Sequence, residues 1–191
     1  MEKEANHIDK IFEKIIYSET GASGEEFDDC TFINCNFSNS DLSGAVFVDC
    51  RMTDCDLSMV KVSQTMMRNV AFINCKVVGV DFSKCLSLLL EVSFEKCCLD
   101  YSIFARNKLS KTTFKECVIK DADFTEADLT GACFDDCDLL NTVFHRTNLS
   151  TTDFRTSRNY TINLEKNMVR KAKFSYDGIG GLLRQYDIVI E

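Results

Sequence analysis

Residues 121–134 read Asp121-Ala122-Asp123-Phe124-Thr125-Glu126-Ala127-Asp128-Leu129-Thr130-Gly131-Ala132-Cys133-Phe134. A large apolar residue stands at every fifth position and a small residue two places before it, while the remaining positions hold mostly acidic residues, Thr and Gly. An α-helix would space its apolar residues at a period of about 3.6, and a strand at a period of 2. A period of five instead predicts short extended segments separated by turns, with the apolar and the small residue inward, which is typical of a β-solenoid.

The same rule covers most of the chain on both sides of this stretch. Nearly all of the 15 phenylalanines lie on the five-residue lattice. It runs from Phe27 to Phe82, from Phe94 to Phe154 and, after a gap, from Leu164 to Phe174. If four repeats close one coil, residues one coil apart stack in four ladders. The ladders are Phe27, Phe47, Met67, Leu89, Leu109, Leu129, Leu149, Val169; Phe32, Met52, Phe72, Phe94, Phe114, Phe134, Phe154, Phe174; Phe37, Leu57, Val77, Leu99, Ile119, Leu139; and Leu42, Val62, Phe82, Phe104, Phe124, Phe144, Leu164.

An insertion of two residues interrupts the lattice between Phe82 and Phe94. Taking Leu89 as the centre of the repeat that follows Phe82 keeps all four ladders in order. The extra residues, within 85–91, should therefore project outward without changing which side chains share a face.

This pattern resembles the pentapeptide-repeat family, whose consensus is approximately A-(D/N)-(L/F)-x-x. Residues 40–44 (SDLSG), 122–126 (ADFTE) and 127–131 (ADLTG) match it closely. The resemblance covers about residues 25–175. It implies an all-β fold, a right-handed quadrilateral β-helix in which four pentapeptides close one coil.

Composition restricts the possible partners. The chain has 191 residues, enough for one domain, and a net charge of −8. An acidic protein lacks the basic footprint that nucleic acids and anionic membranes require. No apolar run reaches the 18 residues of a membrane span, and the charged start Met1-Glu2-Lys3-Glu4 is not followed by a signal-peptide core. We therefore expect a cytoplasmic protein that binds neither nucleic acid nor membrane.

The eleven cysteines follow the repeat rather than a metal or disulfide motif. No Cys-x-x-Cys pair exists, and His7 and His145 have no cysteine at zinc-site spacing. Cβ atoms stacked at about 4.8 Å would exceed the ~3.8 Å that a disulfide prefers. We expect buried free thiols acting as small apolar filler, with a metal or redox role as the alternative, and no cofactor. Nine cysteines occupy the small-residue position: Cys30, Cys35, Cys50, Cys55, Cys75, Cys85, Cys97, Cys117 and Cys137.

The N-terminal segment predicts a helix. Ile8, Ile11, Phe12, Ile15 and Ile16 recur at the spacing of an amphipathic helix over residues 5–18. Because the open end of a solenoid exposes its core and a strand edge, residues 1–24 are interpreted as a capping helix with a linker. A helix that binds a partner is the alternative.

The C-terminal segment, residues 176–191, predicts a short helix followed by a strand-like tail. It resembles the C-terminal segment of Qnr-like pentapeptide-repeat proteins, which builds a homodimer interface. The resemblance implies a homodimer, and its expected interface residues are Ile179, Leu182, Leu183, Tyr186, Ile188 and Ile190.

Two functions remain open from the sequence, and neither is enzymatic. A core filled by Phe and Leu leaves no substrate cavity, and no nucleophile is paired with His145. The first function is a rigid scaffold that binds an unidentified protein. The second follows from the resemblance to Qnr-like and mycobacterial fluoroquinolone-resistance proteins, acidic DNA mimics that bind DNA gyrase or topoisomerase IV. Mimicry would use an acidic stretch without Lys or Arg: Asp121, Asp123, Glu126, Asp128, Asp135, Asp136 and Asp138.

Magnitudes favour the scaffold. About seven to eight coils at ~4.8 Å give a rod of roughly 35–40 Å. Duplex DNA of that length carries about 20 charges. The chain offers only −8 and lacks the larger loops of Qnr proteins.

Overall fold

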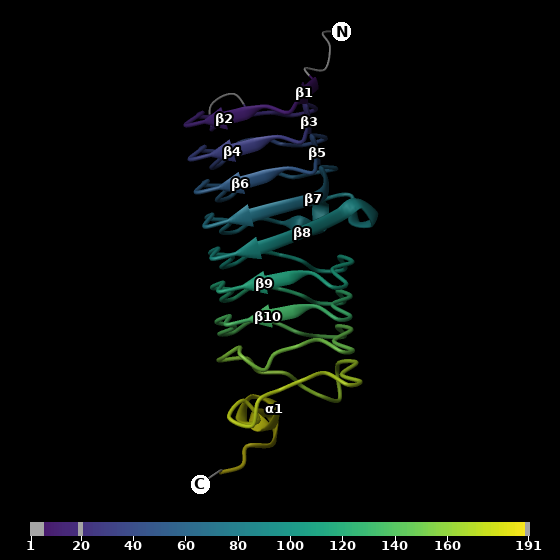
Figure 1. Cartoon of the computed structure of the whole chain (residues 1–191). Coiled ribbons are helices and arrows are strands. Elements are labelled where there is room, and N and C mark those ends of the chain that lie inside the picture. The colour runs from purple at the N-terminus through teal and green to yellow at the C-terminus, as the bar shows by residue number, and fades with distance from the viewer. Residues whose placement is uncertain (1–5, 19–20, 190–191) are drawn as a thin grey trace.

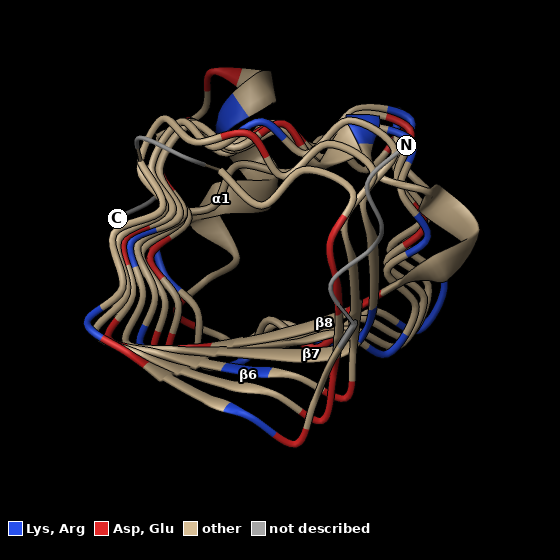
Figure 2. Ribbon diagram, turned by 90° about the horizontal axis from the view of Figure 1, so that it is seen from above, with Lys and Arg blue, Asp and Glu red and all other residues tan. Residues whose placement is uncertain are grey.

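The computed structural model describes residues 6–18 and 21–189, which form an elongated rod of stacked coils (Figure 1). Each coil has four short sides, and viewed along the axis the chain encloses a four-sided outline (Figure 2). All strand pairs are parallel, as a solenoid requires. The fold is thus the parallel β-solenoid that the five-residue period predicts. Its strands are β1 (Asn6–Ile8), β2 (Ile11–Glu13), β3 (Glu26–Asp28), β4 (Thr31–Ile33), β5 (Val46–Val48), β6 (Arg51–Thr53), β7 (Met66–Ile73), β8 (Leu90–Glu95), β9 (Thr113–Lys115) and β10 (Cys133–Asp135).

The pairing confirms four repeats per coil. Phe27 pairs with Phe47 between β3 and β5, and Phe32 pairs with Met52 between β4 and β6. The other two sides of each coil are joined by single bridges rather than by strands. We name the four sides after their inward residues in one coil: the Phe27 face, the Phe32 face, the Phe37 face and the Leu42 face.

The interior is a solid stack of side chains. Along the Phe32 face the rings of Phe114 and Phe134 stack with centroids 4.6 Å apart and planes 2° from parallel. Rings on neighbouring faces meet edge to face, as do Phe124 and Phe134 at 5.9 Å. Both geometries are the favourable ones for aromatic pairs, each contributing about 0.5–1.5 kcal/mol beyond area burial.

The small-residue position satisfies backbone carbonyls as well as filling space. The Thr147 hydroxyl donates to the carbonyl oxygen of Phe124 in the preceding coil at 2.9 Å. The Cys117 thiol likewise donates to Phe94 at 3.5 Å. Ser, Thr and Cys suit this position because each is small and carries a donor. All nine cysteines predicted there are buried free thiols.

The corners of the coils use left-handed backbone. Residues two places after an inward residue have positive φ, for example Asn34 at 52° and Asp54 at 55°. Asn and Asp tolerate this region better than most residues because their short side chains hydrogen-bond locally. The polar residues between repeat centres therefore serve the turns as well as the surface.

The insertion keeps the faces in order, but its centre is not Leu89. Leu90 pairs with Met67 and is 3% exposed, whereas Leu89 is 36% exposed. The extra residues form a projecting 3-10 turn, η2 (Ser87–Leu89), after an earlier one, η1 (Phe82–Lys84). Beyond this turn Phe94 again pairs with Phe72. The inward residue of this repeat is therefore Leu90, one residue later than predicted, because Leu89 is the last residue of the turn and points outward.

The helix expected over residues 5–18 is wrong for the part that the structure describes. Residues 6–18 contain β1 and β2, which pair with β3 and β4 and so form a further coil of the solenoid. His7, Phe12 and Tyr17 stack on the inward rings of the next coil. Pairing with an existing strand edge outweighs the helical spacing of the isoleucines, which face outward instead.

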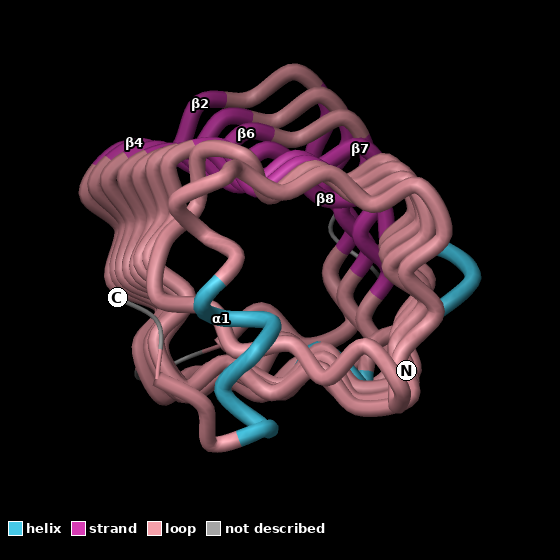
Figure 3. Tube along the Cα trace, turned by 90° about the horizontal axis from the view of Figure 1, so that it is seen from below, coloured by secondary structure: helices cyan, strands magenta, loops and turns pink. Residues whose placement is uncertain are grey.

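The C-terminal end is closed by short helical turns, α1 (Gly180–Leu183) and η3 (Arg184–Tyr186). Figure 3 shows α1 lying across the end of the last coil. Leu182 is buried against the core, and the Ile162 amide donates to the Gly181 carbonyl at 3.1 Å. The predicted short C-terminal helix is therefore confirmed. Among the residues described, no helix is long and apolar enough to span a membrane.

Candidate interaction surface

The outward side chains form rows that run along the rod. Equivalent positions in successive coils are bridged, as in the series Asn36, Asp56 and Lys76 on the Phe37 face. A row places one side chain about every 4.8 Å, the spacing of paired strands. The surface that a partner meets is therefore set by residues one coil apart, not by neighbours in sequence.

The seven predicted acidic residues encircle the rod. Asp128 lies on the Phe27 face, Asp135 on the Phe32 face and Asp138 on the Phe37 face, and their bridge or strand partners lie in the adjacent coils. Asp123 lies on the Leu42 face, while Asp121, Glu126 and Asp136 occupy left-handed corners. Figure 2 shows acidic segments on every side of the axis. One sequence-continuous stretch thus forms a ring one coil high.

Three members of this ring have basic partners. Glu126 contacts Arg106 at 2.9 Å and Arg146 at 3.6 Å. The hydrogen bond from Arg106 and its charge lower the pKa of Glu126 below the ordinary value. Asp136 pairs with Arg158 at 3.0 Å.

The third member, Asp138, is 9% exposed and lies 3.5 Å from Lys120. Its burial opposes ionisation, but the hydrogen bond from Asn159 and the Lys120 charge lower its pKa overall.

The other four acids accept hydrogen bonds from nearby residues of the same chain. Asp123 accepts the Thr125 amide at 2.8 Å, and Asp128 accepts the Thr130 amide at 3.1 Å. These contacts stabilise turns, as Asp side chains commonly do. In the next coil, Asn141 donates to Asp121 and Thr156 donates to Asp135. The ring therefore has a structural role in addition to its charge.

Sequence reasoning did not compare the charges of the two ends of the rod. Residues 21–60 carry eight Asp and Glu against one Arg, whereas residues 140–189 carry eight Lys and Arg against four Asp and Glu. One end of the rod is acidic and the other is basic. The signal was present in the sequence, because each coil takes about twenty residues and charge could have been counted coil by coil.

The C-terminal residues predicted to form a dimer interface lie in different environments. Leu182 packs into the core of its own chain and Leu183 is half-buried. Ile179, Tyr186 and Ile188 are exposed, and the Tyr186 hydroxyl donates to Glu165 at 3.1 Å. Ile190 lies outside the described residues.

The described residues contain no group of three or more His, Cys, Asp or Glu side chains that could hold a metal ion. Two thiols in the small-residue position, those of Cys50 and Cys85, have little tendency to ionise. Burial raises the pKa of Cys50 to about 11 and that of Cys85 to about 12. These cysteines are consequently poor nucleophiles at neutral pH.

A rod of coil-stacked five-residue repeats with a filled interior is a quadrilateral β-solenoid. Two family models match the chain, one for a pentapeptide repeat region over residues 25–87 and one for eight copies of pentapeptide repeats over residues 122–158. The chain belongs to the pentapeptide-repeat family. No curated protein sequence matches it at a significant level.

Solved structures of the same family resemble the rod. A trypsin-treated variant of QnrB1, a plasmid-mediated fluoroquinolone resistance protein, aligns with a TM-score of 0.62 and 18% identity over 98% of both chains. HetL from the cyanobacterium Nostoc sp. strain PCC 7120, involved in heterocyst differentiation regulation, aligns with a TM-score of 0.54 and 13% identity. That alignment covers 91% of this chain and 89% of HetL. At these identities the likeness establishes the shared fold.

Proposed function

We propose that this protein is a rigid, non-enzymatic scaffold that binds another protein through its charged side faces. The observation that carries the proposal is the combination of a solid core with regular outward rows. Phe rings stack from coil to coil through the interior, for example Phe104 on Phe124 at 4.9 Å. Backbone hydrogen bonds join the coils, as between the Phe104 amide and the Asp123 carbonyl at 2.7 Å. Such a rod holds its surface side chains in place, so a partner meets a preorganised face.

The grooves of the described residues support the same conclusion. One, of about 490 Å³, lies beside the projecting turn and is lined by residues including Ser87, Lys108 and Ser110. A second, of about 430 Å³, lies at the C-terminal end beside Tyr160 and Arg184. In the first groove the Ser110 hydroxyl donates to the Asp128 carboxylate of the next coil at 3.1 Å. Neither groove is lined by a histidine, the side chain that most often activates a hydroxyl or thiol nucleophile.

Partner capture with charge variants tests the scaffold function. The wild-type chain and two single variants, Lys61→Glu on the Leu42 face and Lys76→Glu on the Phe37 face, would each be used as bait, and retained proteins identified by mass spectrometry. A partner lost from one variant would then be purified and its dissociation constant measured against each bait. A scaffold predicts at least one partner whose affinity depends on one face. If every retained protein binds all baits equally, the scaffold proposal is wrong.

Mimicry of DNA toward gyrase or topoisomerase IV is the second candidate. The acidic N-terminal coils favour it, together with the overall charge of −8. Because QnrB1 is described as a fluoroquinolone resistance protein, the decisive assay is gyrase supercoiling with and without ciprofloxacin. The seven acids of the ring are the proposed contacts. Asp123→Asn and Asp128→Asn would weaken inhibition while keeping the acceptor for each turn. Unchanged supercoiling at micromolar wild-type protein and low salt contradicts mimicry.

We also propose that a second copy binds at the C-terminal end, as the resemblance to Qnr-like proteins implies. The exposure of Ile179 and Ile188 supports this. Apolar side chains gathered at one end of a repeat rod mark an association site.

A further inference from the structure

The Phe27 face reverses its charge along the rod. The strand register places Ile8, Asp28 and Val48 in one row, and the bridges place Lys108, Asp128 and Asn148 in another row of the same face. Left-handed corners border the face along one edge. The N-terminal coils present five acids here, and the C-terminal coils present four bases and one acid, Asp128. The five acids are Asp9, Glu26, Asp28, Asp29 and Asp49, and the bases are Lys108, Lys111, Arg170 and Lys171.

These charges are largely uncompensated within the described part of the chain. None of these acids and bases belongs to a salt bridge there, although Asp128 lies beside Lys108 in the adjacent coil and offsets part of its charge. Other charged rows are neutralised internally, for example by the pair between Lys115 and Glu95 at 2.9 Å. The negative charge of the N-terminal half of the Phe27 face and the positive charge of its C-terminal half can therefore attract a partner.

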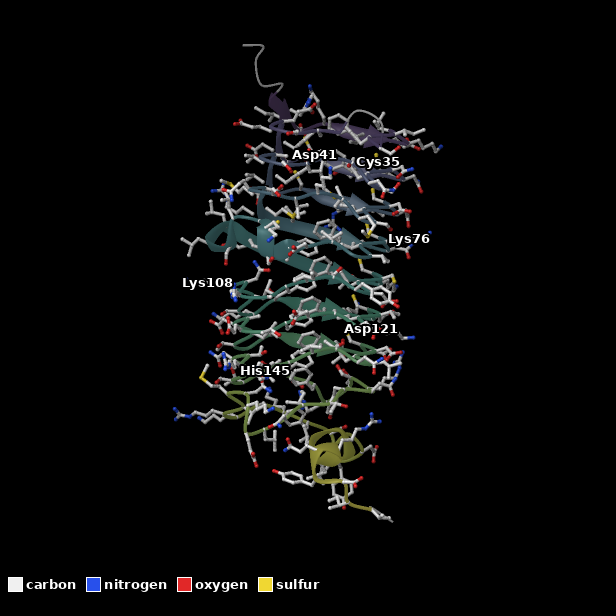
Figure 4. The ribbon with its side chains drawn as sticks, turned by 180° about the vertical axis from the view of Figure 1, so that it is seen from behind. Cys35, Asp41, Lys76, Lys108, Asp121 and His145 are labelled. Carbon is white, nitrogen blue, oxygen red and sulfur yellow. The ribbon has the colours of Figure 1, made fainter. Side chains whose placement is uncertain are left out.

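A projection and a groove lie side by side where the charge reverses. The turn η2 carries Leu88, which is 75% exposed, out from the face. Beside it lies the groove of about 490 Å³, whose lining includes Val70, Lys108, Lys111 and Thr112. Lys108 lies directly below the projecting turn (Figure 4). A knob next to a hole on one surface is self-complementary under a two-fold axis, because each copy inserts its knob into the other's hole.

We propose that two copies of this chain pair side by side and antiparallel through the Phe27 face, each inserting Leu88 into the groove of the other. The two-fold axis would lie in the interface, across the rods, between the coil of Glu91 and the coil of Lys108. This operation reverses the direction of the rod but preserves the position across the face, so a corner meets a corner.

That single register places opposite charges in facing coils at three levels. Asp28 comes opposite Arg170, and the corner residue Asp29 comes opposite the corner residue Lys171. Nearer the axis, the coil of Arg68 faces the coil of Asp128, and the coil of Glu91 faces the coil of Lys108. Beside the axis, Lys108 and Lys111 of the two copies lie one coil apart, and Glu91 of the facing coil offsets their repulsion.

A second copy fits this face better than a polyanion or a uniformly charged protein. Phosphates would be attracted to Lys108 and Lys111 but repelled by Asp28 and Asp29 on the same face. A partner must itself reverse its charge over several coils to match both halves. This chain supplies such a surface with the required length and spacing.

Paired charge reversals test the contact on the full chain. The acid-reversed variant carries Asp28→Lys, Asp29→Lys and Asp49→Lys, and the base-reversed variant carries Lys108→Glu, Lys111→Glu and Arg170→Glu. Lysine fits the left-handed corners of Asp29 and Asp49, because Lys111 and Lys171 occupy equivalent corners with φ of 63° and 58°. Every chain in the comparison, including the one with the wild-type face, also carries Ile179→Asp with Ile188→Asp, so that the proposed C-terminal contact does not contribute. Sedimentation equilibrium at low salt gives the dimer dissociation constant, and circular dichroism confirms that each variant is folded.

Each variant alone should dimerise about tenfold or more weakly than wild type, because like charges would then meet across the axis. Mixing the two should restore a one-to-one dimer, since one copy is now acidic along the face and the other basic. Leu88→Asp should weaken both the wild-type dimer and the mixed one. The matched control, Lys61→Glu with Lys76→Glu and Lys96→Glu, makes the same change in net charge as the base-reversed variant but on other sides, and should dimerise like wild type.

Several results would overturn the pairing. One is a chain with the wild-type face that remains monomeric at low salt throughout the micromolar range, including one that instead binds DNA through Lys108 and Lys111. Another is a dimer of that chain that tolerates both reversals. A third is failure of the mixture to dimerise when both variants are folded.

Discussion

Phe72 and Phe94 stack with ring centroids 5.1 Å apart and pair in register between β7 and β8, although the chain between them is two residues longer than in other coils. The extra residues leave the coil through η2 and return at Leu90. The aromatic stack therefore remains continuous, and the backbone instead departs from the regular coil in this turn. Burial of large rings outweighs the cost of a short exposed turn.

Replacing a stacked ring should destabilise the rod strongly. Phe94→Ala removes a buried side chain that stacks on Phe72 and Phe114. We expect a loss of about 3–5 kcal/mol in the free energy of unfolding, measured by urea titration. The control Leu88→Ala, in the exposed turn, should change it by less than about 0.5 kcal/mol. A loss for Phe94→Ala no larger than for Leu88→Ala would contradict the continuous stack.

The small-residue position should prefer a donor over mere size. Thr147→Val keeps the volume but leaves the Phe124 carbonyl without its side-chain donor. We expect a cost of about 0.5–1.5 kcal/mol in the free energy of unfolding, because the carbonyl loses one hydrogen bond and keeps the one from the Ala127 amide. Thr147→Ser, which keeps the hydroxyl, should cost less. Equal stabilities of the Val and Ser variants would show that this position selects for size alone.

The repeat core was readable from sequence because one inward residue per five leaves a strong signal. Phe32, Phe72 and Phe114 share a face as the spacing predicts, since each coil repeats the same constraint. Because the coils stack regularly, residues at a fixed spacing in the sequence lie above one another in the structure.

The first coil was missed because its inward residues are chemically diverse. His7, Phe12 and Tyr17 keep the five-residue spacing, but a polar histidine begins it and isoleucines between them mimic a helical stripe. Only stacking on Phe27, Phe32 and Phe37 shows which period governs this segment. Similarly, local sequence could not distinguish Leu89 from Leu90 in the insertion, because both are leucines and the turn geometry decides between them.

The acidic stretch illustrates a different limit. Asp123 and Asp138 are close in sequence but lie on different faces, since a coil turns through all four sides in about twenty residues. Lys108 and Asp121 lie at opposite edges of the rod for the same reason (Figure 4). In a solenoid, a surface patch is therefore formed by residues one coil apart, about twenty positions in sequence.

The cysteines should divide into two classes by their rate of reaction with a thiol reagent. Nine are buried, whereas Cys98 and Cys133 are half-buried. Burial raises the pKa of Cys85 to about 12, so the reactive thiolate is scarce until the pH rises well above neutrality. We expect rapid labelling only at Cys98 and Cys133 in the native protein at neutral pH. Peptide mapping after a short pulse that found Cys55, Cys75 and Cys97 labelled as quickly would refute this.

Stability on the acid side should depend on Asp153. Hydrogen bonds from Arg155, one of them 2.8 Å long, lower the pKa of Asp153 to about 2. The ordinary value is about 3.9, so this contribution is fully present above about pH 4 and is lost as the pH falls toward 2. It is modest, about 1 kcal/mol or less, because the pair is exposed to solvent. In Arg155→Ala the pKa of Asp153, followed by NMR titration, should rise toward the ordinary value. Arg170→Ala, a control on another face, should leave it unchanged.

The C-terminal end should support a dimer even where charge pairing is screened. Leu182 closes the last coil, while Ile179 and Ile188 remain exposed for a second copy. In about 0.5 M salt, which suppresses surface charge attraction, the full chain should sediment as a dimer. A chain ending at Tyr176 should be monomeric or insoluble, because it loses both the cap and the apolar contact. Ile179→Asp with Ile188→Asp keeps Leu182 and α1, and should give a folded, soluble monomer under the same conditions. A soluble dimer from the chain ending at Tyr176 in high salt would place the apolar interface elsewhere on the rod.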